Sequence, residues 1–270
     1  MKLFDTHAHF WDLRFESELG NAELDSLLSG LLSGEVPHIV NVATDPASAR
    51  LCVAQAAKYP GMYTALGIHP NDGQALSDPD AALAEIEALL RDGASRAVAL
   101  GEIGLDYHYD GTDKPRQMAL FRAQMALAER LSLPVVIHDR DAHGDCMDIV
   151  REYPGVRGIF HSYSGSAEMA AELCRRGYYV SFSGPITFKN ADRVRAVAAT
   201  VPHDRLLIET DCPYLTPHPH RGKLNHSGYL SYTNAALAAA VGLTAEECAA
   251  LTYRNACHVF GLDGKPEVEI

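Results

Sequence analysis

Several features that direct a chain to a membrane or an oxidising compartment are missing from this sequence. Its apolar runs are short and interrupted, so no transmembrane helix is predicted. The opening residues Met1-Lys2-Leu3-Phe4-Asp5 reach an acidic side chain at once and contain no apolar signal segment. The six cysteines include no Cys-x-x-Cys pair, so we expect free thiols and no cysteine-held zinc. We therefore expect a cytoplasmic protein with no membrane partner.

Positive charge is also scarce. The 23 lysines and arginines face 35 aspartates and glutamates, which gives a formal net charge of −12. This balance argues against a broad basic surface for nonspecific binding of nucleic acid. It does not exclude an enzyme that acts on nucleic acid, because bound divalent cations and a few local cations can reverse the sign of the charge inside one cleft.

The sequence does contain a regular alternation of short apolar segments and longer helical patterns. The hydrophobic fraction of 47% and the charged fraction of 21% are typical of a globular protein. The length suits one domain over residues 1–270. Apolar segments predict eight strands, at 3–9, 37–44, 62–68, 97–102, 134–138, 158–161, 178–182 and 205–211. Helical patterns occupy 22–32, 47–58, 79–90, a segment from 113, 142–152, 166–176, 191–199 and two segments near the end.

Eight strands that alternate with helices over about 250 residues predict an α/β fold of the (β/α)8 TIM-barrel type. An open, doubly wound sheet is the alternative. It is less favoured because the strand count stops at eight and no glycine-rich phosphate turn follows the first strand.

Histidines and carboxylates stand at the predicted C-terminal ends of five strands. His7 and His9 are two residues apart, so they share one face of an extended strand. Active sites of TIM barrels form at this end of the strands. Chance could place one histidine at a strand end, but it is a poor explanation for the whole set. The candidate metal ligands are His7, His9, Glu102, His138, His161 and Asp211.

This set exceeds what one tetrahedral ion needs and suits two divalent ions about 3.5–4 Å apart. Glu102 is predicted to bridge the ions, because a carboxylate has two oxygens to share. His7, His9 and Asp211 would hold one ion, and His138 and His161 the other. Asp211 is also predicted to accept a proton from the attacking water, so Asp211 and Glu102 are the catalytic candidates. Four imidazoles favour zinc, manganese, iron or nickel by ligand softness, and magnesium stays open because nucleases are commonly assayed with it.

Motifs along nearly the whole chain resemble those of the TatD-type metal-dependent deoxyribonucleases. They include Asp5-Thr6-His7-Ala8-His9, Gly67-Ile68-His69-Pro70, Gly101-Glu102-Ile103-Gly104-Leu105-Asp106-Tyr107, Ile137-His138-Asp139-Arg140, His161-Ser162-Tyr163-Ser164-Gly165 and Glu209-Thr210-Asp211-Cys212-Pro213-Tyr214-Leu215. The resemblance implies an amidohydrolase-type barrel, the same six metal ligands, and DNA as substrate, often degraded from a 3′ end.

Two positions depart from the family pattern. His226-Ser227 stands where the family commonly has Glu-Pro, and His108 stands where an aromatic residue is usual. These differences leave substrate preference and the rigidity of the loop after the last strand open.

Five further residues are candidates for binding substrate phosphate: His69, Arg140, Lys189, Arg221 and Lys223. For His69 the alternative is a histidine satisfied by its neighbours, and for Arg140 it is a salt bridge to Asp139 or Asp141. For the other three it is a solvated loop. Tyr107 and Tyr214 are candidates for stacking on a base, with packing under a loop favoured. Asp5 and Glu209 are expected to orient the ligands.

The resulting prediction is a metal-dependent hydrolase that cleaves phosphodiester bonds of single-stranded or damaged DNA. The main alternative is a small-molecule hydrolase on the same barrel, acting on a lactone, amide or phosphoester. Many such enzymes bridge their ions with a carboxylated lysine, and no lysine stands at a suitable strand end here. A metal-binding protein without turnover is the weakest alternative. No protein partner is implied, and we expect a monomer.

Overall fold

A computed structural model describes residues 1–263 of the chain. In this part of the chain, eight parallel strands form one sheet in the order β1 to β8. A bridge between Ala8 and Cys212 joins the two edges of the sheet. The barrel is therefore nearly closed, and the predicted TIM-barrel fold is confirmed. The strands are β1 (Phe4–Ala8), β2 (His38–Val42), β3 (Met62–Ala65), β4 (Ala97–Asp106), β5 (Val135–Arg140), β6 (Gly158–Phe160), β7 (Tyr179–Phe182) and β8 (Leu206–Ile208).

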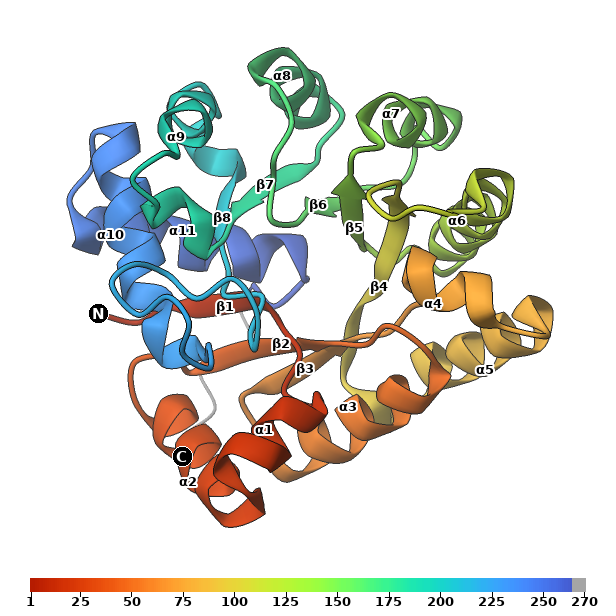
Figure 1. The fold of residues 1–270 in the computed structure, drawn as a ribbon, viewed down its shortest axis with the longest axis horizontal. Helices are drawn as coiled ribbons and strands as arrows, with labels where there is room; N and C mark the ends of the chain where they lie inside the picture. Colours follow the sequence, from red (N-terminus) through yellow and green to blue (C-terminus); the bar gives the residue numbers. More distant parts are fainter. Residues whose placement is uncertain (264–270) are drawn as a thin grey trace.

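Helices surround the strands, as Figure 1 shows. Two short helices, α1 and α4, were not predicted from the sequence. The others lie close to their predicted ranges. The α-helices are α1 (Leu13–Leu19), α2 (Asn21–Ser33), α3 (Pro46–Lys58), α4 (Pro70–Ala75), α5 (Pro79–Arg91), α6 (Lys114–Leu131), α7 (His143–Glu152), α8 (Ala167–Arg175), α9 (Asp192–Ala198), α10 (Leu230–Val241) and α11 (Ala245–Val259). Short 3₁₀ turns are η1 (Gly93–Ser95), η2 (Gly184–Thr187), η3 (His203–Arg205) and η4 (Ser227–Tyr229).

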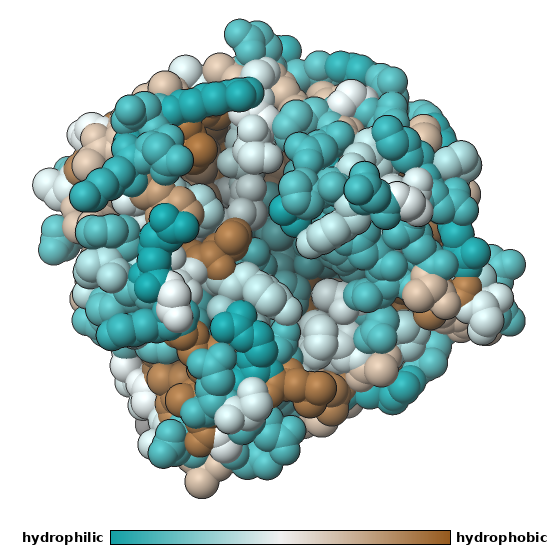
Figure 2. Space-filling view, viewed as in Figure 1, coloured by the Kyte–Doolittle hydropathy of each residue, from teal (hydrophilic) through white to brown (hydrophobic). Residues whose placement is uncertain are grey.

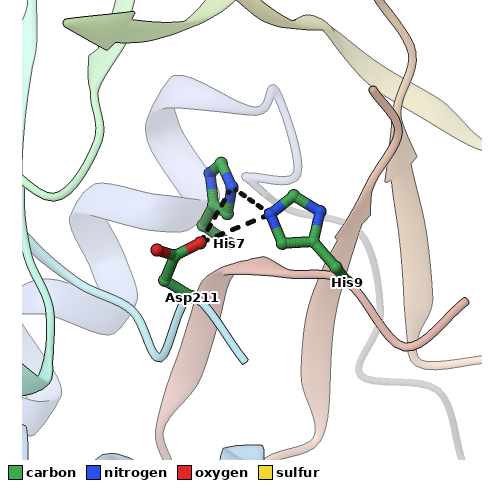
Figure 3. Close-up of side chains that lie close together, drawn as sticks. All are labelled: His7, His9 and Asp211. Carbon is green, nitrogen blue, oxygen red and sulfur yellow. Dashed lines mark hydrogen bonds and ion pairs between the residues drawn. The ribbon is translucent and has the colours of Figure 1, made fainter. Parts of the chain in front are cut away.

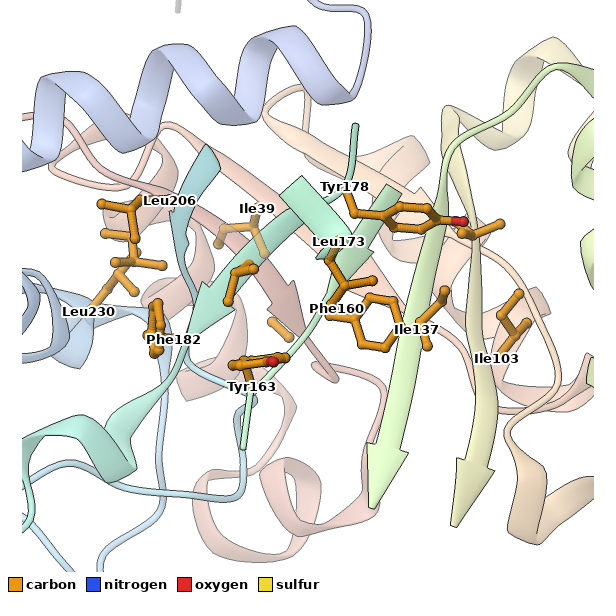
Figure 4. Close-up of a cluster of buried hydrophobic side chains, with 14 of the residues drawn as sticks. Ile39, Ile103, Ile137, Phe160, Tyr163, Leu173, Tyr178, Phe182, Leu206 and Leu230 are labelled. Carbon is orange, nitrogen blue, oxygen red and sulfur yellow. The ribbon is translucent and has the colours of Figure 1, made fainter. Parts of the chain in front are cut away.

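Alternation along the strands separates two apolar layers. In β5, Val135 and Ile137 belong to the larger cluster, which also contains helix residues such as Leu173 of α8 (Figure 4). Val136, between them, belongs to a second cluster with Phe4 of β1. Ala256 of α11 lies in that second cluster. Both faces of the strands are thus buried, as expected for a parallel barrel covered by helices.

The longest strand, β4, extends ten residues and ends at Asp106 rather than at Glu102. It pairs with β5 up to the pair Asp106 and Arg140. The predicted strand, 97–102, did not include the segment after Glu102. That segment is buried strand, and it brings a further carboxylate to the mouth of the barrel.

Other expectations concern the whole chain. All six cysteines are free, as predicted. Within residues 1–263, no single helix is long and apolar enough to cross a membrane. One pair of helical segments separated by a bend, Ser227–Val241 and Ala245–Val259, is together long and apolar enough by length and composition only. The predicted domain range of 1–270 includes residues 264–270, which lie outside the described part.

Candidate metal centre

The first half of the site is formed by two strands that are far apart in sequence. His7 and His9 come from β1 and the residue after it, and Asp211 follows β8. The Nε2 atoms of the two histidines are 3.0 Å apart. Oδ1 of Asp211 lies 3.6 Å from His7 Nε2 and 3.3 Å from His9 Nε2. Figure 3 shows the two rings and the carboxylate pointing toward one another.

The second half comes from β4, β5 and the end of β6. Oε1 of Glu102 lies 2.8 Å from His138 Nδ1 and 2.8 Å from His161 Nε2. These two ring nitrogens are 3.2 Å from each other.

Glu102 joins the two halves. Its other oxygen, Oε2, lies 3.4 Å from His7 Nε2 and 3.7 Å from His9 Nε2. Each carboxylate oxygen thus faces one pair of imidazoles. This is the arrangement that a carboxylate shared between two cations requires, and the structure brings all six predicted ligands together.

Three of the histidines are oriented by the hydrogen-bond partners of the ring nitrogens that point away from the centre. His9 Nδ1 lies 2.8 Å from the carbonyl oxygen of Val42. A carbonyl only accepts, so Nδ1 carries the proton and Nε2 keeps its lone pair. His161 Nδ1 lies 3.3 Å from Glu209 Oε1, and His138 Nε2 lies 3.3 Å from Asp106 Oδ2. Such outer carboxylates orient histidines that ligate metals, so this donor set fits divalent cations.

Charges within the site are strongly coupled. Burial alone would raise the pKa of Glu102, but His161, His7 and His138 outweigh it and hold the pKa well below its usual range. Burial alone would lower the pKa of His161, but Glu102 and Glu209 raise it well above its usual range. The neighbouring carboxylates thus favour the charged form of His161.

His69 takes part in a different way. Its Nδ1 accepts a hydrogen bond of 3.2 Å from the backbone N–H of Asn71, at the start of α4. Nε2 then carries the ring proton, and it lies 3.9 Å from Glu102 Oε1. Burial and the neighbouring His138 lower the pKa of His69 to about 3. His69 therefore presents a neutral N–H to the site, which suits contact with substrate better than metal ligation.

The predicted phosphate-binding cations are less uniform. Arg140 lines the cavity above the site, and its guanidinium carbon lies 5.5 Å from the centre of the Tyr109 ring. Lys189 and Lys223 are exposed and do not line this cavity. Arg221 is also exposed and lies over the ring of Phe188 at 4.3 Å. Whether these four residues contact substrate stays a prediction.

Three residues near the site were not predicted. Asp106 contacts His138, Tyr109 lines the cavity, and Ser227 donates a hydrogen bond to Asp5. A signal for Asp106 was present, because Glu102 and Asp106 are four residues apart and would share a face if the strand continued.

Of the two tyrosines proposed for stacking, Tyr214 lines the cavity. Tyr107 instead donates a hydrogen bond to Asp145 and does not line it.

The cavity has a volume of about 780 Å³. Figure 2 shows it as a hollow near the middle of the molecular face that is also seen in Figure 1. Carboxylates outside the predicted ligand set line it: Asp12, Asp72, Asp106 and Asp139. Among the described residues that line it, Arg140 is the only arginine or lysine.

A TIM barrel whose mouth gathers imidazoles around shared carboxylates defines a metal-dependent hydrolase. The chain belongs to the family described as TatD related DNase, whose sequence profile matches residues 4–261.

Individual relatives agree with this assignment. The chain is 40% identical over 264 residues to YabD of Bacillus subtilis, an uncharacterized metal-dependent hydrolase, covering 97% of this chain and 100% of the relative. It is 38% identical over 243 residues to the metal-dependent hydrolase TatD of Mycobacterium tuberculosis, covering 88% and 90%. Among solved structures, the TatD homologue YjjV of Escherichia coli superposes with a TM-score of 0.87 at 29% identity, covering 96% of this chain and 98% of that one.

Proposed function

We propose that this protein hydrolyses phosphodiester bonds of DNA with two divalent metal ions. The observation that carries the proposal is the position of Glu102, with one oxygen toward His138 and His161 and the other toward His7 and His9. The family description supports DNA as the substrate. Two such ions, when bound, would activate a water molecule and neutralise charge on the phosphoryl oxygens.

The chain's own residues then have distinct tasks. Asp211 lies beside the first histidine pair, and the hydrogen bond with His9 helps to lower its pKa despite burial. It is thus ionised and able to accept a proton from the attacking water. His69 offers its Nε2 proton to a phosphoryl oxygen, and Arg140 approaches the same group from the cavity wall.

A small phosphoester is the second candidate substrate. The carboxylates that line the cavity, with Arg140 as their only arginine or lysine counterpart among the described lining residues, favour a ligand with a single phosphate. A long polyanion would meet repulsion from these walls once it extends beyond the metal centre. We also propose a cytoplasmic monomer, and the free cysteines support a reducing compartment.

The test begins with protein stripped by a chelator. Magnesium, manganese, zinc or nickel is then restored separately. Each sample is incubated with single-stranded DNA labelled at its 3′ or 5′ end, with RNA, and with a panel of small phosphoesters, lactones and amides. We expect metal-dependent loss of the DNA label, and no loss with Glu102→Gln. Metal-dependent turnover of small esters with intact DNA would contradict the proposal and favour the second candidate.

A further inference from the structure

Two exposed tyrosines stand at the mouth of the cavity. Tyr109 is 56% exposed and Tyr214 is 46% exposed, and both line the cavity. Exposed aromatic rings beside a polar site are not part of the core, and they offer flat surfaces to a ligand. The rings of Tyr109 and Tyr214 are thus well placed to bind a planar group.

The strand order places the loops that carry these rings on opposite sides of the barrel mouth. Tyr109 follows β4, and Tyr214 follows β8. In the strand order β1 to β8, these strands are four positions apart, so they face each other across a closed ring of eight. Glu102 comes from β4 and Asp211 follows β8, so each tyrosine stands on the side of one carboxylate of the site.

Each ring is held in place by polar contacts. The Tyr214 hydroxyl donates to Asp12 Oδ2 at 2.6 Å, and the ring lies edge-on to His9 with centroids 6.3 Å apart. Arg140 Nη1 donates to the Tyr109 hydroxyl at 3.4 Å. An arginine also accompanies each ring, with Arg14 5.7 Å from the Tyr214 centroid and Arg140 5.5 Å from the Tyr109 centroid. Both rings are therefore positioned before any ligand arrives.

We propose that Tyr109 and Tyr214 stack against the two bases that flank the scissile phosphate. A phosphodiester link in DNA has one nucleoside on each side, and a cavity of about 780 Å³ is large enough to hold more than a phosphate. The ligand class is a dinucleotide step, with its phosphate at the metal centre and a base against each tyrosine. This inference rests on the proposed function, which it extends from the bond that is cut to the groups beside it.

The test measures binding without turnover. The ligand is a dithymidine in which a methylene group replaces the scissile ester oxygen. Two further ligands lack the base on either the 5′ or the 3′ side. Binding to the metal-loaded protein is followed by calorimetry for the native chain, Tyr109→Ala, Tyr214→Ala and the control Tyr232→Ala. Tyr232 is similarly exposed, at 39%, but does not line the cavity.

We expect loss of either base to weaken binding to the native chain by about 5- to 150-fold, the range of one base stacked on an aromatic ring. Tyr109→Ala should remove this preference for the base on one side, and Tyr214→Ala for the base on the other. Tyr232→Ala should keep both preferences. Phenylalanine at position 109 or 214 keeps a ring and should restore the preference that alanine removes.

The outcomes separate this inference from the proposed function. Equal binding of all three ligands to the native chain, or unchanged preferences in both alanine variants, would overturn the stacking role even if DNA is cleaved. Tyrosine-dependent preference for bases in a protein that leaves DNA intact would support the stacking role and overturn the nuclease.

Discussion

Ser227 donates its hydroxyl proton to Oδ2 of Asp5 at 2.6 Å, and both side chains are fully buried. The bond joins the loop after β8 to the first strand. Asp5 also accepts hydrogen bonds from the backbone N–H and the hydroxyl of Thr210. The serine that distinguishes this chain from the common Glu-Pro pattern thus ties the loop beside the metal centre, a contact that proline could not make.

Replacing Ser227 with alanine should lower the free energy of unfolding by about 2 kcal/mol, because a buried carboxylate oxygen loses a hydrogen-bond donor. Urea denaturation monitored by circular dichroism measures the change. Ser33→Ala is the matched control, since Ser33 is exposed and its hydroxyl bonds only to carbonyls of its own helix. Equal stability of Ser227→Ala and Ser33→Ala would show that the bond to Asp5 does not stabilise the fold.

The stability contributed by Asp5 should fall as pH rises. Burial outweighs its hydrogen bonds and raises the pKa from 3.8 to about 6, so the folded state favours the protonated carboxyl. This contribution is complete below pH 3.8 and is lost as pH rises through 6. Relative to Asp5→Asn, which does not ionise, the native chain should lose about 2 kcal/mol between roughly pH 4.5 and 7.5. Urea titrations of both chelator-treated proteins at several pH values test this. If the unfolding free energies of the native chain and Asp5→Asn change with pH in parallel, the prediction is contradicted.

Asp106→Asn should weaken binding of the cation beside His138 by about 10- to 100-fold, because the outer carboxylate no longer orients the imidazole. Metal competition with a fluorescent chelator gives the affinity. Asp110→Asn removes an exposed carboxylate from the segment that follows β4 and serves as the control. If both variants bind metal like the native chain, Asp106 has no role in positioning His138.

Glu102→Gln and Asp211→Asn should each reduce kcat by at least about 100-fold while leaving the fold intact. Both substitutions keep the shape of the side chain and remove the charge that cations need. Steady-state kinetics on the substrate found by the metal screen, together with thermal unfolding, separates lost chemistry from lost structure. Near-native turnover in both purified variants would refute the roles assigned to these carboxylates.

The strands and the six predicted ligands follow from the sequence because both patterns are local. Short apolar runs set the strands, and the barrel then places every strand end at one rim. By contrast, α1 and α4 have seven and six residues, too few to show a repeating apolar stripe. The end of β4 was misread because Gly104 interrupts its apolar pattern, and this concealed Asp106.

Contacts that depend on side-chain placement were harder to predict. Arg221 was predicted from its loop position as a phosphate-binding candidate, and that position does not reveal that its guanidinium lies over the ring of Phe188. The bond between Ser227 and Asp5 joins residues 222 positions apart, and no local pattern reports it. Tyr109 and Tyr214 line one cavity because the barrel brings the segments after β4 and β8 to the same rim.

Closure of the barrel is also what completes the site. His7 and His9 come from β1 and the residue after it, whereas Asp211 follows β8. A chain without the segment after β8 would keep both imidazoles but would lack Asp211, so this group of three ligands would be incomplete. Completion of this group therefore depends on the contact between Ala8 and Cys212 that joins the first strand to the segment after the last one.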